Sequence, residues 1–252
     1  MTMRETDSQR MRKVHGSGIV LRWTLLLFAA ALCINAGAGS AEAAGGAETA
    51  QRPTGTIVAL GDSLTAAYGL PEDAGYPARL EKKLNDAGLD YRVVNAGVSG
   101  ETSSGALSRI KWMLSMKPDI VILETGANDG LRGIPTDLMQ RNIDDAVKAI
   151  QESGATVVLA GMKMLRNMGR EYTDRFEAAY TAVAKARGVI LMPFFLEGVA
   201  GDPNLNQEDG IHPTAKGYAI ITENIYPYVV KAIEERTSGR DASPPREAKP
   251  SE

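Results

Sequence analysis

The sequence predicts an α/β protein in which a parallel sheet lies between two layers of helices. Short apolar runs alternate with amphipathic stretches along most of the chain, which is the order of elements in such proteins. The apolar runs are continuous, as expected of strands that are buried on both faces. Right-handed crossovers leave few ways to wind the sheet. We therefore expect a three-layer α/β/α domain.

Five apolar runs are the expected strands, at residues 56–60, 91–95, 119–125, 156–161 and 189–192. The run at 119–125 (DIVILET) has the strongest strand character, because it is rich in β-branched residues. Amphipathic stretches follow each strand and predict helices at residues 76–87, 102–116, 136–153, 172–187 and 213–235.

The first 43 residues have the pattern of a secretory signal peptide. Basic residues lead into an apolar stretch over residues 23–38, and Ala41-Glu42-Ala43 is a cleavage site of the A-x-A type. An uncleaved anchor is the alternative, but Gly, Asn35 and Ser40 interrupt the run and leave it short for a membrane span. Cys33 follows the bulky Leu32, which disfavours lipidation. We expect an exported bacterial protein, periplasmic or secreted, with no stable membrane span after processing.

Cleavage changes the inventory of reactive side chains. His15 and Cys33 leave with the leader, so His212 is the one remaining histidine and no cysteine remains. A thiol nucleophile, a disulfide framework and a Cys/His zinc site are thereby excluded, and we expect no metal and no cofactor. Without the leader, 23 basic and 28 acidic residues give a net charge of −5, which argues against nucleic acid as a partner.

The domain boundaries follow from composition. Residues 44–54 are small and polar and predict a linker. Residues 237–252 have almost no apolar side chains and three prolines, so we expect a disordered tail. One domain at residues 55–236 remains between them.

The stretch Gly61-Asp62-Ser63 delivers a serine at the end of the first strand, just before residues that can start a helix. Gly61 allows a sharp turn, and free N–H groups at a helix start stabilise a nearby anion. Taken alone, the pattern fits equally well a residue that only caps the following helix. Asn95-Ala96-Gly97 follows the second strand and Gly126-Ala127-Asn128-Asp129 follows the third. If strand one lies between these two strands, the three loops meet at one edge of the sheet.

His212 is the candidate base for Ser63, because a serine hydroxyl needs a neighbouring base to become a nucleophile. Asp209 lies three residues before it and can reach Nδ1–H, which leaves Nε2 free to face Ser63. The alternative for a D-x-x-H pattern is a pair of metal ligands, but no Cys or second His remains to complete such a site. The expected catalytic residues are Ser63, Asp209 and His212.

Acyl transfer also needs hydrogen-bond donors for the oxyanion. The candidates are the amides of Ser63 and Gly97 and the side chain of Asn128, one from each loop. A turn glycine and a helix cap are the plainer interpretations of Gly97 and Asn128. Asp129 is interpreted as a local backbone partner.

These residues resemble the four ordered blocks of the GDSL or SGNH hydrolases. The blocks are Gly61–Leu64, Asn95–Gly100, Gly126–Asp129 and Asp209–Pro213, and the resemblance extends from about Thr56 to Val230. It implies a flavodoxin-like five-stranded sheet, no metal, and the catalytic and oxyanion residues named above. The sequences around Asn128 and at 193–197 (PFFLE) resemble the exported arylesterase, acyl-CoA thioesterase and lysophospholipase group. The stretch Met164–Arg166 departs from the small or Pro-rich loop expected there and leaves the preferred acyl length open.

The expected partner is a small-molecule acyl ester or thioester. Apolar residues near the strand ends are the candidate acyl contacts, although core packing would explain each of them equally well: Leu70, Ile134, Met162, Met164, Leu165 and Phe195. No large inserted lid is visible, so we expect a shallow groove. Thr65 stands where a G-x-S-x-G elbow has its final glycine, which disfavours the α/β-hydrolase fold.

Two other functions fit parts of the pattern. The same triad could remove acetyl groups from carbohydrates, but no aromatic platform for a sugar is visible near the motifs. A flavodoxin-like domain could bind a phosphate-bearing ligand through residues 61–65 without catalysis, but this leaves Asn128, Asp209 and His212 unexplained.

Overall fold

The computed structural model describes residues 53–241. The predicted signal peptide (1–43) and linker (44–54, apart from its last two residues) lie outside the described residues, as does the tail beyond residue 241. None of the described helices is both long enough and apolar enough to cross a bilayer.

A five-stranded parallel sheet forms the centre, in the order β2-β1-β3-β4-β5. Its strands are β1 (Gly55–Gly61), β2 (Tyr91–Gly97), β3 (Ile120–Glu124), β4 (Thr156–Ala160) and β5 (Ile190–Met192). The predicted fold class is confirmed, and β1 lies between β2 and β3. Gly61 pairs with Gly97, and Leu60 with Leu123, so these three strands end at the same edge of the sheet.

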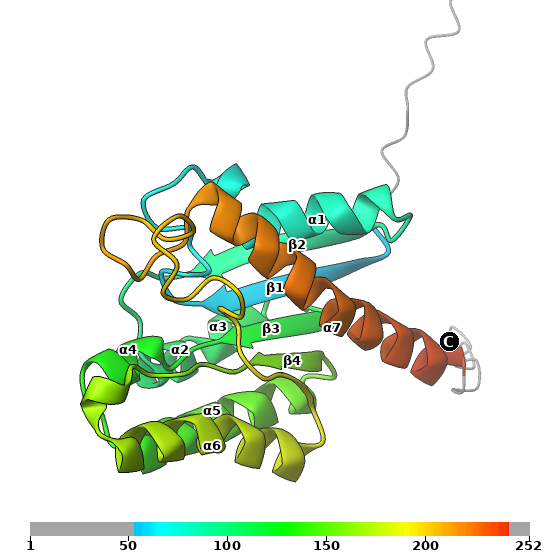
Figure 1. Ribbon diagram of the computed structural model, residues 1–252. Helices are drawn as coiled ribbons and strands as arrows, with labels where there is room; N and C mark the ends of the chain where they lie inside the picture. Colours follow the sequence, from blue (N-terminus) through cyan, green and yellow to red (C-terminus); the bar gives the residue numbers. More distant parts are fainter. Residues whose placement is uncertain (1–52, 242–252) are drawn as a thin grey trace, which may run out of the picture. The chain divides into compact units, whose positions relative to one another are not determined.

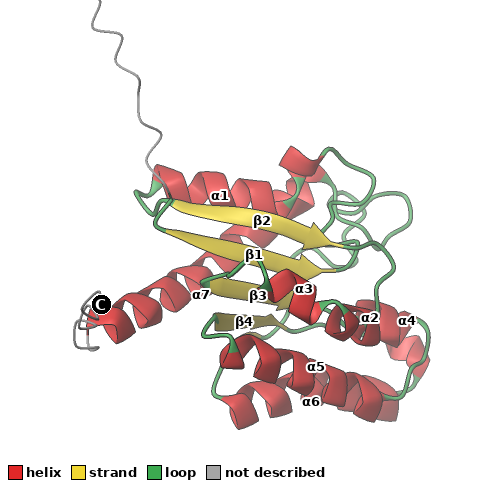
Figure 2. Cartoon of the chain, turned by 180° about the vertical axis from the view of Figure 1, so that it is seen from behind, coloured by secondary structure: helices red, strands yellow, loops and turns green. Residues whose placement is uncertain are grey.

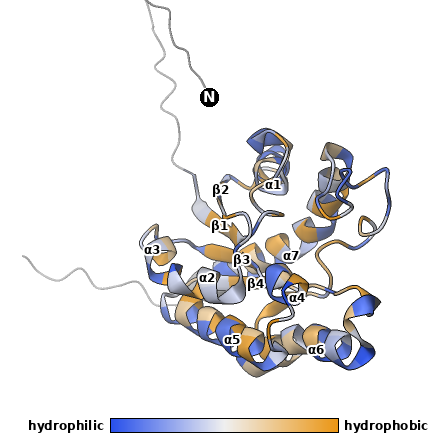
Figure 3. Cartoon of the chain, turned by 90° about the vertical axis from the view of Figure 1, so that its left-hand side faces the viewer, coloured by the Kyte–Doolittle hydropathy of each residue, from blue (hydrophilic) through white to orange (hydrophobic). Residues whose placement is uncertain are grey.

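Helices cover both faces of the sheet. On one face α1 (Tyr76–Asp86) packs against α7 (Ala215–Asp241), as Figure 1 shows. The opposite face, seen in Figure 2, carries four further helices. They are α2 (Ser103–Ser108), α3 (Ile110–Leu114), α5 (Thr136–Glu152) and α6 (Arg170–Arg187). The long helices α5 and α6 alternate hydrophilic and hydrophobic residues, as expected for helices with one buried face (Figure 3).

Several element boundaries differ from the prediction. The helix expected at 102–116 is divided at Arg109, which has a non-helical φ of −103° and ψ of 6° between α2 and α3. A short helix α4 (Ala127–Leu131) and two 3₁₀ turns, η1 (Glu72–Ala74) and η2 (Arg166–Met168), were not predicted. Helix α7 continues to Asp241, so the predicted tail boundary at residue 237 falls inside a helix.

Phe195 belongs to the core and corrects our expectation of a substrate contact. It is completely buried, and its ring meets that of Tyr76 edge to face at 5.2 Å. Neighbouring Phe194 is only half-buried and faces a surface groove. The structure thus places Phe194, and not Phe195, in the wall of the groove.

Phe195→Ala should lower the free energy of unfolding by about 3–5 kcal/mol, because it removes a fully buried aromatic ring and leaves a cavity. The matched variant Phe194→Ala should lower the free energy of unfolding by clearly less, because that ring is already partly exposed. Urea denaturation followed by circular dichroism measures both values. Equal losses in the two variants would contradict this placement of the rings.

Candidate active site

Ser63 lies just after β1, where the backbone turns at the edge of the sheet. Gly61 permits this turn, because a Cβ at that position would lie 2.1 Å from Thr65 Oγ1 and 2.6 Å from Glu124 Oε2. Asp62 Oδ1 then accepts the backbone N–H of Leu64 at 2.9 Å. The carboxylate two residues earlier thus fixes the loop, and the half-buried serine hydroxyl faces the surface pocket described below.

His212 reaches Ser63 from a position 149 residues along the chain. Its Nε2 lies 2.9 Å from Ser63 Oγ, and its Nδ1 lies 2.6 Å from Asp209 Oδ2. The structure therefore brings the three predicted catalytic side chains together in one chain of hydrogen bonds. An imidazole held in this way, with Nδ1–H donating to a carboxylate, has Nε2 free to accept the serine proton.

The loop that holds His212 is tied to the loop that holds Ser63. Gln207 N–H donates to the carbonyl of His212 at 2.7 Å, and Asn206 and Pro213 form an antiparallel bridge. The side chain of Gln207 donates to the carbonyl of Tyr68 at 2.8 Å. The Tyr68 ring in turn packs against the imidazole, with ring centroids 4.6 Å apart.

Asp209 is held in its ionised form. Its Oδ1 accepts hydrogen bonds from the backbone N–H groups of Ile211 at 2.9 Å and His212 at 3.0 Å, while Oδ2 is hydrogen-bonded to Nδ1 of the imidazole. These hydrogen bonds, the backbone bond from His212 first, lower the pKa of Asp209 to about 2. The carboxylate is therefore negative across the range in which the imidazole has to accept a proton.

Asn128 lies close to the nucleophile, on α4. Its Nδ2 donates to Asp62 Oδ2 at 3.1 Å and to the carbonyl of Glu101 at 3.0 Å, and the residue lines the same pocket as Ser63. Gly126, which precedes α4, has a φ of +107°, and a Cβ there would lie 2.3 Å from the hydroxyl of Tyr180. A glycine is therefore needed to turn the chain from β3 into the helix that presents Asn128.

Gly97 does not occupy the position expected of an oxyanion donor. It pairs with Gly61 inside the sheet, and its N–H donates to Asn95 Oδ1 at 3.0 Å. Gly100, three residues further on, lines the pocket beside Ser63 and Asn128. Within residues 53–241, no acceptor takes the backbone N–H of either Ser63 or Gly100. The geometry therefore favours Gly100 in place of Gly97 as the donor from this loop.

Two buried carboxyl groups lie beneath the nucleophile. Glu124 Oε2 accepts the N–H of Asp62 at 3.2 Å and the hydroxyl of Thr65 at 3.0 Å. Burial, together with the charge of Asp62, raises the pKa of Glu124 well above its usual range. Its Oε1 has no hydrogen-bond partner in the described part of the chain. Burial also raises the pKa of Asp62.

An apolar groove leads away from Ser63. The pocket around Ser63 and His212 has a volume of about 170 Å³, and a neighbouring groove has about 310 Å³. Both are lined by Leu64, Ala127, Leu131 and Ile211. A chain attached to a group bound beside Ser63 can therefore continue directly into the groove.

Three of the six predicted acyl contacts line this groove: Met162, Met164 and Leu165. Leu70 and Ile134 line neither cavity, and Phe195 lies in the core. Sequence reasoning missed Tyr68, Leu131, Phe194 and Ile211. The signal for Leu131 and Ile211 was available, because each lies within three residues of a predicted site residue on the same loop.

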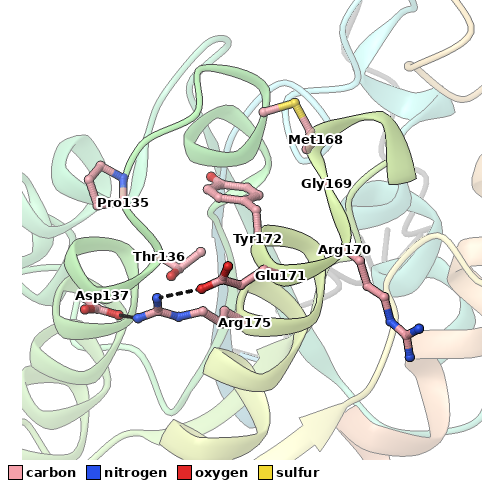
Figure 4. Close-up of a pocket in the computed structure, with 9 residues that line it drawn as sticks. All are labelled: Pro135, Thr136, Asp137, Met168, Gly169, Arg170, Glu171, Tyr172 and Arg175. Atoms are coloured by element: carbon pink, nitrogen blue, oxygen red, sulfur yellow. Dashed lines mark hydrogen bonds and ion pairs between the residues drawn. The ribbon is translucent and has the colours of Figure 1, made fainter.

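Another cavity lies away from Ser63, between the first turns of α5 and α6 (Figure 4). It has a volume of about 470 Å³ and shares Met168 with the groove. Its central cation, Arg175, is paired with Asp137 and Glu171. The charges are thus mutually neutralised. Within residues 53–241, no group of three or more His, Cys, Asp or Glu side chains is arranged to hold a metal ion.

Comparison with known proteins agrees with this arrangement. Residues 59–220 match the GDSL-like lipase/acylhydrolase family. Esterase TesA of Pseudomonas aeruginosa PAO1 is 42% identical over 71% of this chain and 90% of its own length. The arylesterase of Vibrio mimicus is 37% identical over 70% and 89%. Thioesterase 1/protease 1/lysophospholipase L1 of Escherichia coli K12 is 36% identical over 67% and 80%. The crystal structure of TesA superposes with a TM-score of 0.68, covering 70% of this chain and 99% of TesA.

The low pKa of Asp209 predicts how stability changes with pH. The folded-state pKa of about 2 lies below the ordinary value of 3.8, so the stabilisation is complete above the ordinary value and is lost as the pH falls towards 2. Asp209→Asn lacks this titration but keeps an oxygen for the N–H groups of Ile211 and His212. The difference in unfolding free energy between the two proteins should therefore shrink between about pH 5 and pH 2. Urea denaturation at each pH measures it, and a difference that stays constant would contradict the assignment.

Proposed function

The chain belongs to the GDSL-like lipase/acylhydrolase family, and on that premise we propose that it is a serine esterase that hydrolyses carboxylic esters and thioesters. The observation that best supports the proposal is the hydrogen bond of 2.9 Å between Ser63 Oγ and His212 Nε2, with Asp209 on the far side of the imidazole. The names of the relatives, an esterase, an arylesterase and a thioesterase/lysophospholipase, support the same reaction class.

The proposed reaction has two halves. In the first, Ser63 Oγ attacks the carbonyl carbon while its proton passes to His212 Nε2, and the carbonyl oxygen becomes an oxyanion. His212 then gives the proton to the leaving alcohol or thiol as its bond to the carbonyl carbon breaks, which leaves an acyl-Ser63 ester. In the second half, His212 takes a proton from water as its oxygen attacks the acyl carbon. The bond between that carbon and Ser63 Oγ then breaks, His212 returns the proton to Oγ, and the carboxylic acid is released.

Three donors would stabilise the oxyanion in both halves. They are the backbone N–H groups of Ser63 and Gly100 and the side-chain amide of Asn128, which line one pocket with the nucleophile. Asn128 Nδ2 gives its two N–H groups to Asp62 Oδ2 and to the carbonyl of Glu101, so the N–H that points to Asp62 has to turn to the oxyanion when it forms. Loss of one such donor typically costs ~3 kcal/mol of transition-state stabilisation. Asp209 keeps the imidazole in the required tautomer and offsets its positive charge while it holds the proton.

The groove defines the substrates that we propose. A volume of about 310 Å³ with mostly apolar walls fits a single acyl chain, so monoacyl esters, aryl esters of short and medium acids, acyl thioesters and lysophospholipids are the candidate substrates. We also propose export to the bacterial periplasm or exterior, on the basis of residues 1–43 alone.

A carbohydrate O-acetyl esterase is the second candidate, and one observation favours it. Tyr68 is 52% exposed and lies against His212 at the mouth of the pocket. It supplies the aromatic surface that was not recognised in the sequence. Comparing kcat/KM for acetylated xylan with kcat/KM for aryl esters decides between the two functions, because a carbohydrate O-acetyl esterase should have the higher value on the polymer.

Ser63→Ala tests the nucleophile. The wild-type protein should hydrolyse p-nitrophenyl acetate and butyrate and be labelled by a serine-directed phosphonate, whereas the variant should lose the label and essentially all of the rate. Ser115→Ala is the matched control, because that exposed hydroxyl binds only a nearby carbonyl in its own helix turn. Full activity in Ser63→Ala would exclude this site as the centre of hydrolysis.

Met164→Ala tests the groove. Its side chain lines the wall and fills the space over Gly130, so its removal should move the optimum of kcat/KM towards longer acyl chains. Each additional buried methylene is worth about 0.8 kcal/mol, or roughly fourfold in rate. Leu70→Ala should leave the chain-length profile unchanged, because Leu70 lies outside both cavities. An unshifted optimum in Met164→Ala, with acetate hydrolysis intact, would place the acyl chain elsewhere.

A further inference from the structure

A buried ion pair lies directly behind the loops that carry the proposed oxyanion donors. Arg109 Nε donates to Glu101 Oε1 and Arg109 Nη2 donates to Glu101 Oε2, both at 2.7 Å. The side chains are only 17% and 8% exposed. The proposed reaction uses neither residue, although an isolated buried pair is often no better for stability than apolar side chains of the same size.

Arg109 joins the ends of two strands. Besides Glu101, its Nη2 donates to the carbonyl of Ala96 at 2.7 Å and lies 3.3 Å from the carbonyl of Gly61. These carbonyls lie at the carboxyl ends of β2 and β1, and Gly61 is two residues before Ser63. The planar fork of a guanidinium group can serve a carboxylate and two carbonyls at once, which a lysine ammonium on a flexible stem cannot reproduce.

Glu101 carries the connection on to the third loop. Its backbone carbonyl accepts Asn128 Nδ2 at 3.0 Å, and its backbone follows directly after Gly100. Space for its side chain is provided by Gly105, where a Cβ would lie 2.7 Å from Glu101 Cγ. The side chain of Arg109 is thus bonded to the backbone that leads into the Ser63 loop and the Gly100 loop. Its partner Glu101 directly follows Gly100 and binds the side chain of Asn128 through its backbone carbonyl.

We infer that Glu101 and Arg109 are positioning residues, which hold the Gly100 and Asn128 amides on the side of Ser63 where the oxyanion forms. Neither residue touches the substrate, and the inference rests on the proposed esterase function. Exposed pairs such as Lys82–Asp86 have a replaceable role on the surface. Loss of Arg109, in contrast, removes the ion-pair partner of the largely buried Glu101 carboxylate and the side-chain donor to the carbonyl of Ala96, while the carbonyl of Gly61 keeps the N–H of Val98.

Arg109→Met is the direct test. Donors that move by about 1 Å can cost 10²-fold in rate, so we expect kcat for p-nitrophenyl butyrate to fall by about 10- to 100-fold. KM should stay near the wild-type value, because the interaction that is weakened is made in the transition state. The rate constant for labelling of Ser63 by a phosphonate should fall by a similar factor, since its phosphoryl oxygen occupies the oxyanion position.

Arg236→Met is the matched control for a purely structural effect. Arg236 pairs with Asp119 with side chains 20% and 17% exposed, and Asp119 lies just before β3 at the opposite edge of the sheet. Arg236→Met should lower the thermal stability about as much as Arg109→Met does, but it should keep the wild-type kcat and the wild-type labelling rate. If both variants lose only stability, the inference is overturned.

Two milder variants keep the test usable if Arg109→Met does not fold. Arg109→Lys retains the charge without the fork, and Glu101→Gln retains the shape without the charge, so both should lower kcat with little change in KM. Wild-type kcat in both would overturn the inference. If the wild-type protein itself hydrolyses no ester and Ser63 takes no label, the proposed function fails. An active wild type with unaffected variants defeats the positioning role alone.

Discussion

The parallel register of β1, β2 and β3 is the constraint on which the site depends. Gly61 pairs with Gly97 and Leu60 with Leu123, so the loops that follow these strands begin at one level of the sheet. Ser63, Gly100 and Asn128 come from these three loops and line one pocket. A shift of one strand by a residue would turn its side chains to the opposite face and would separate the donors from the nucleophile.

The imidazole joins this arrangement by a different route. His212 lies in the loop before α7, far from the three strands in sequence, and the packing of α7 against α1 brings that loop back over the nucleophile (Figure 1). Gln207 and Tyr68 tie the two loops together. The catalytic hydrogen bond is thus supported by contacts that have no chemical part in the reaction, in the same way that Glu101 and Arg109 support the donors.

The sequence predicted the strands, their central order and the proximity of Ser63, Asp209 and His212, because these depend on periodicity and on short fixed spacings. It named Gly97 as the backbone donor, whereas the geometry favours Gly100, because the two glycines lie three residues apart and only their backbone conformations distinguish them. Gly97 pairs within the sheet, whereas Gly100 follows it with a φ of +79°. Phe195 was expected to contact substrate although it lies in the core, because the sequence does not show which of two adjacent aromatic side chains after the last strand faces inward.

Buried polar networks were the features least accessible from sequence. Nothing in the spacing of Glu101 and Arg109, eight residues apart, distinguishes a buried pair from an exposed one on a helix. Their burial results from the break between α2 and α3 at Arg109, which the amphipathic pattern of residues 102–116 did not reveal. The raised pKa of Glu124 beneath Asp62 likewise depends on burial produced by the packing of β1 against β3.

A crystal structure of the protein after reaction with a small alkyl phosphonate would test the central claim most directly. We expect phosphorus bonded to Ser63 Oγ, with its free oxygen within hydrogen-bond distance of Ser63 N, Gly100 N and Asn128 Nδ2, and the alkyl group directed towards the groove. An adduct on another residue, or an oxygen that faces away from all three donors, would contradict it.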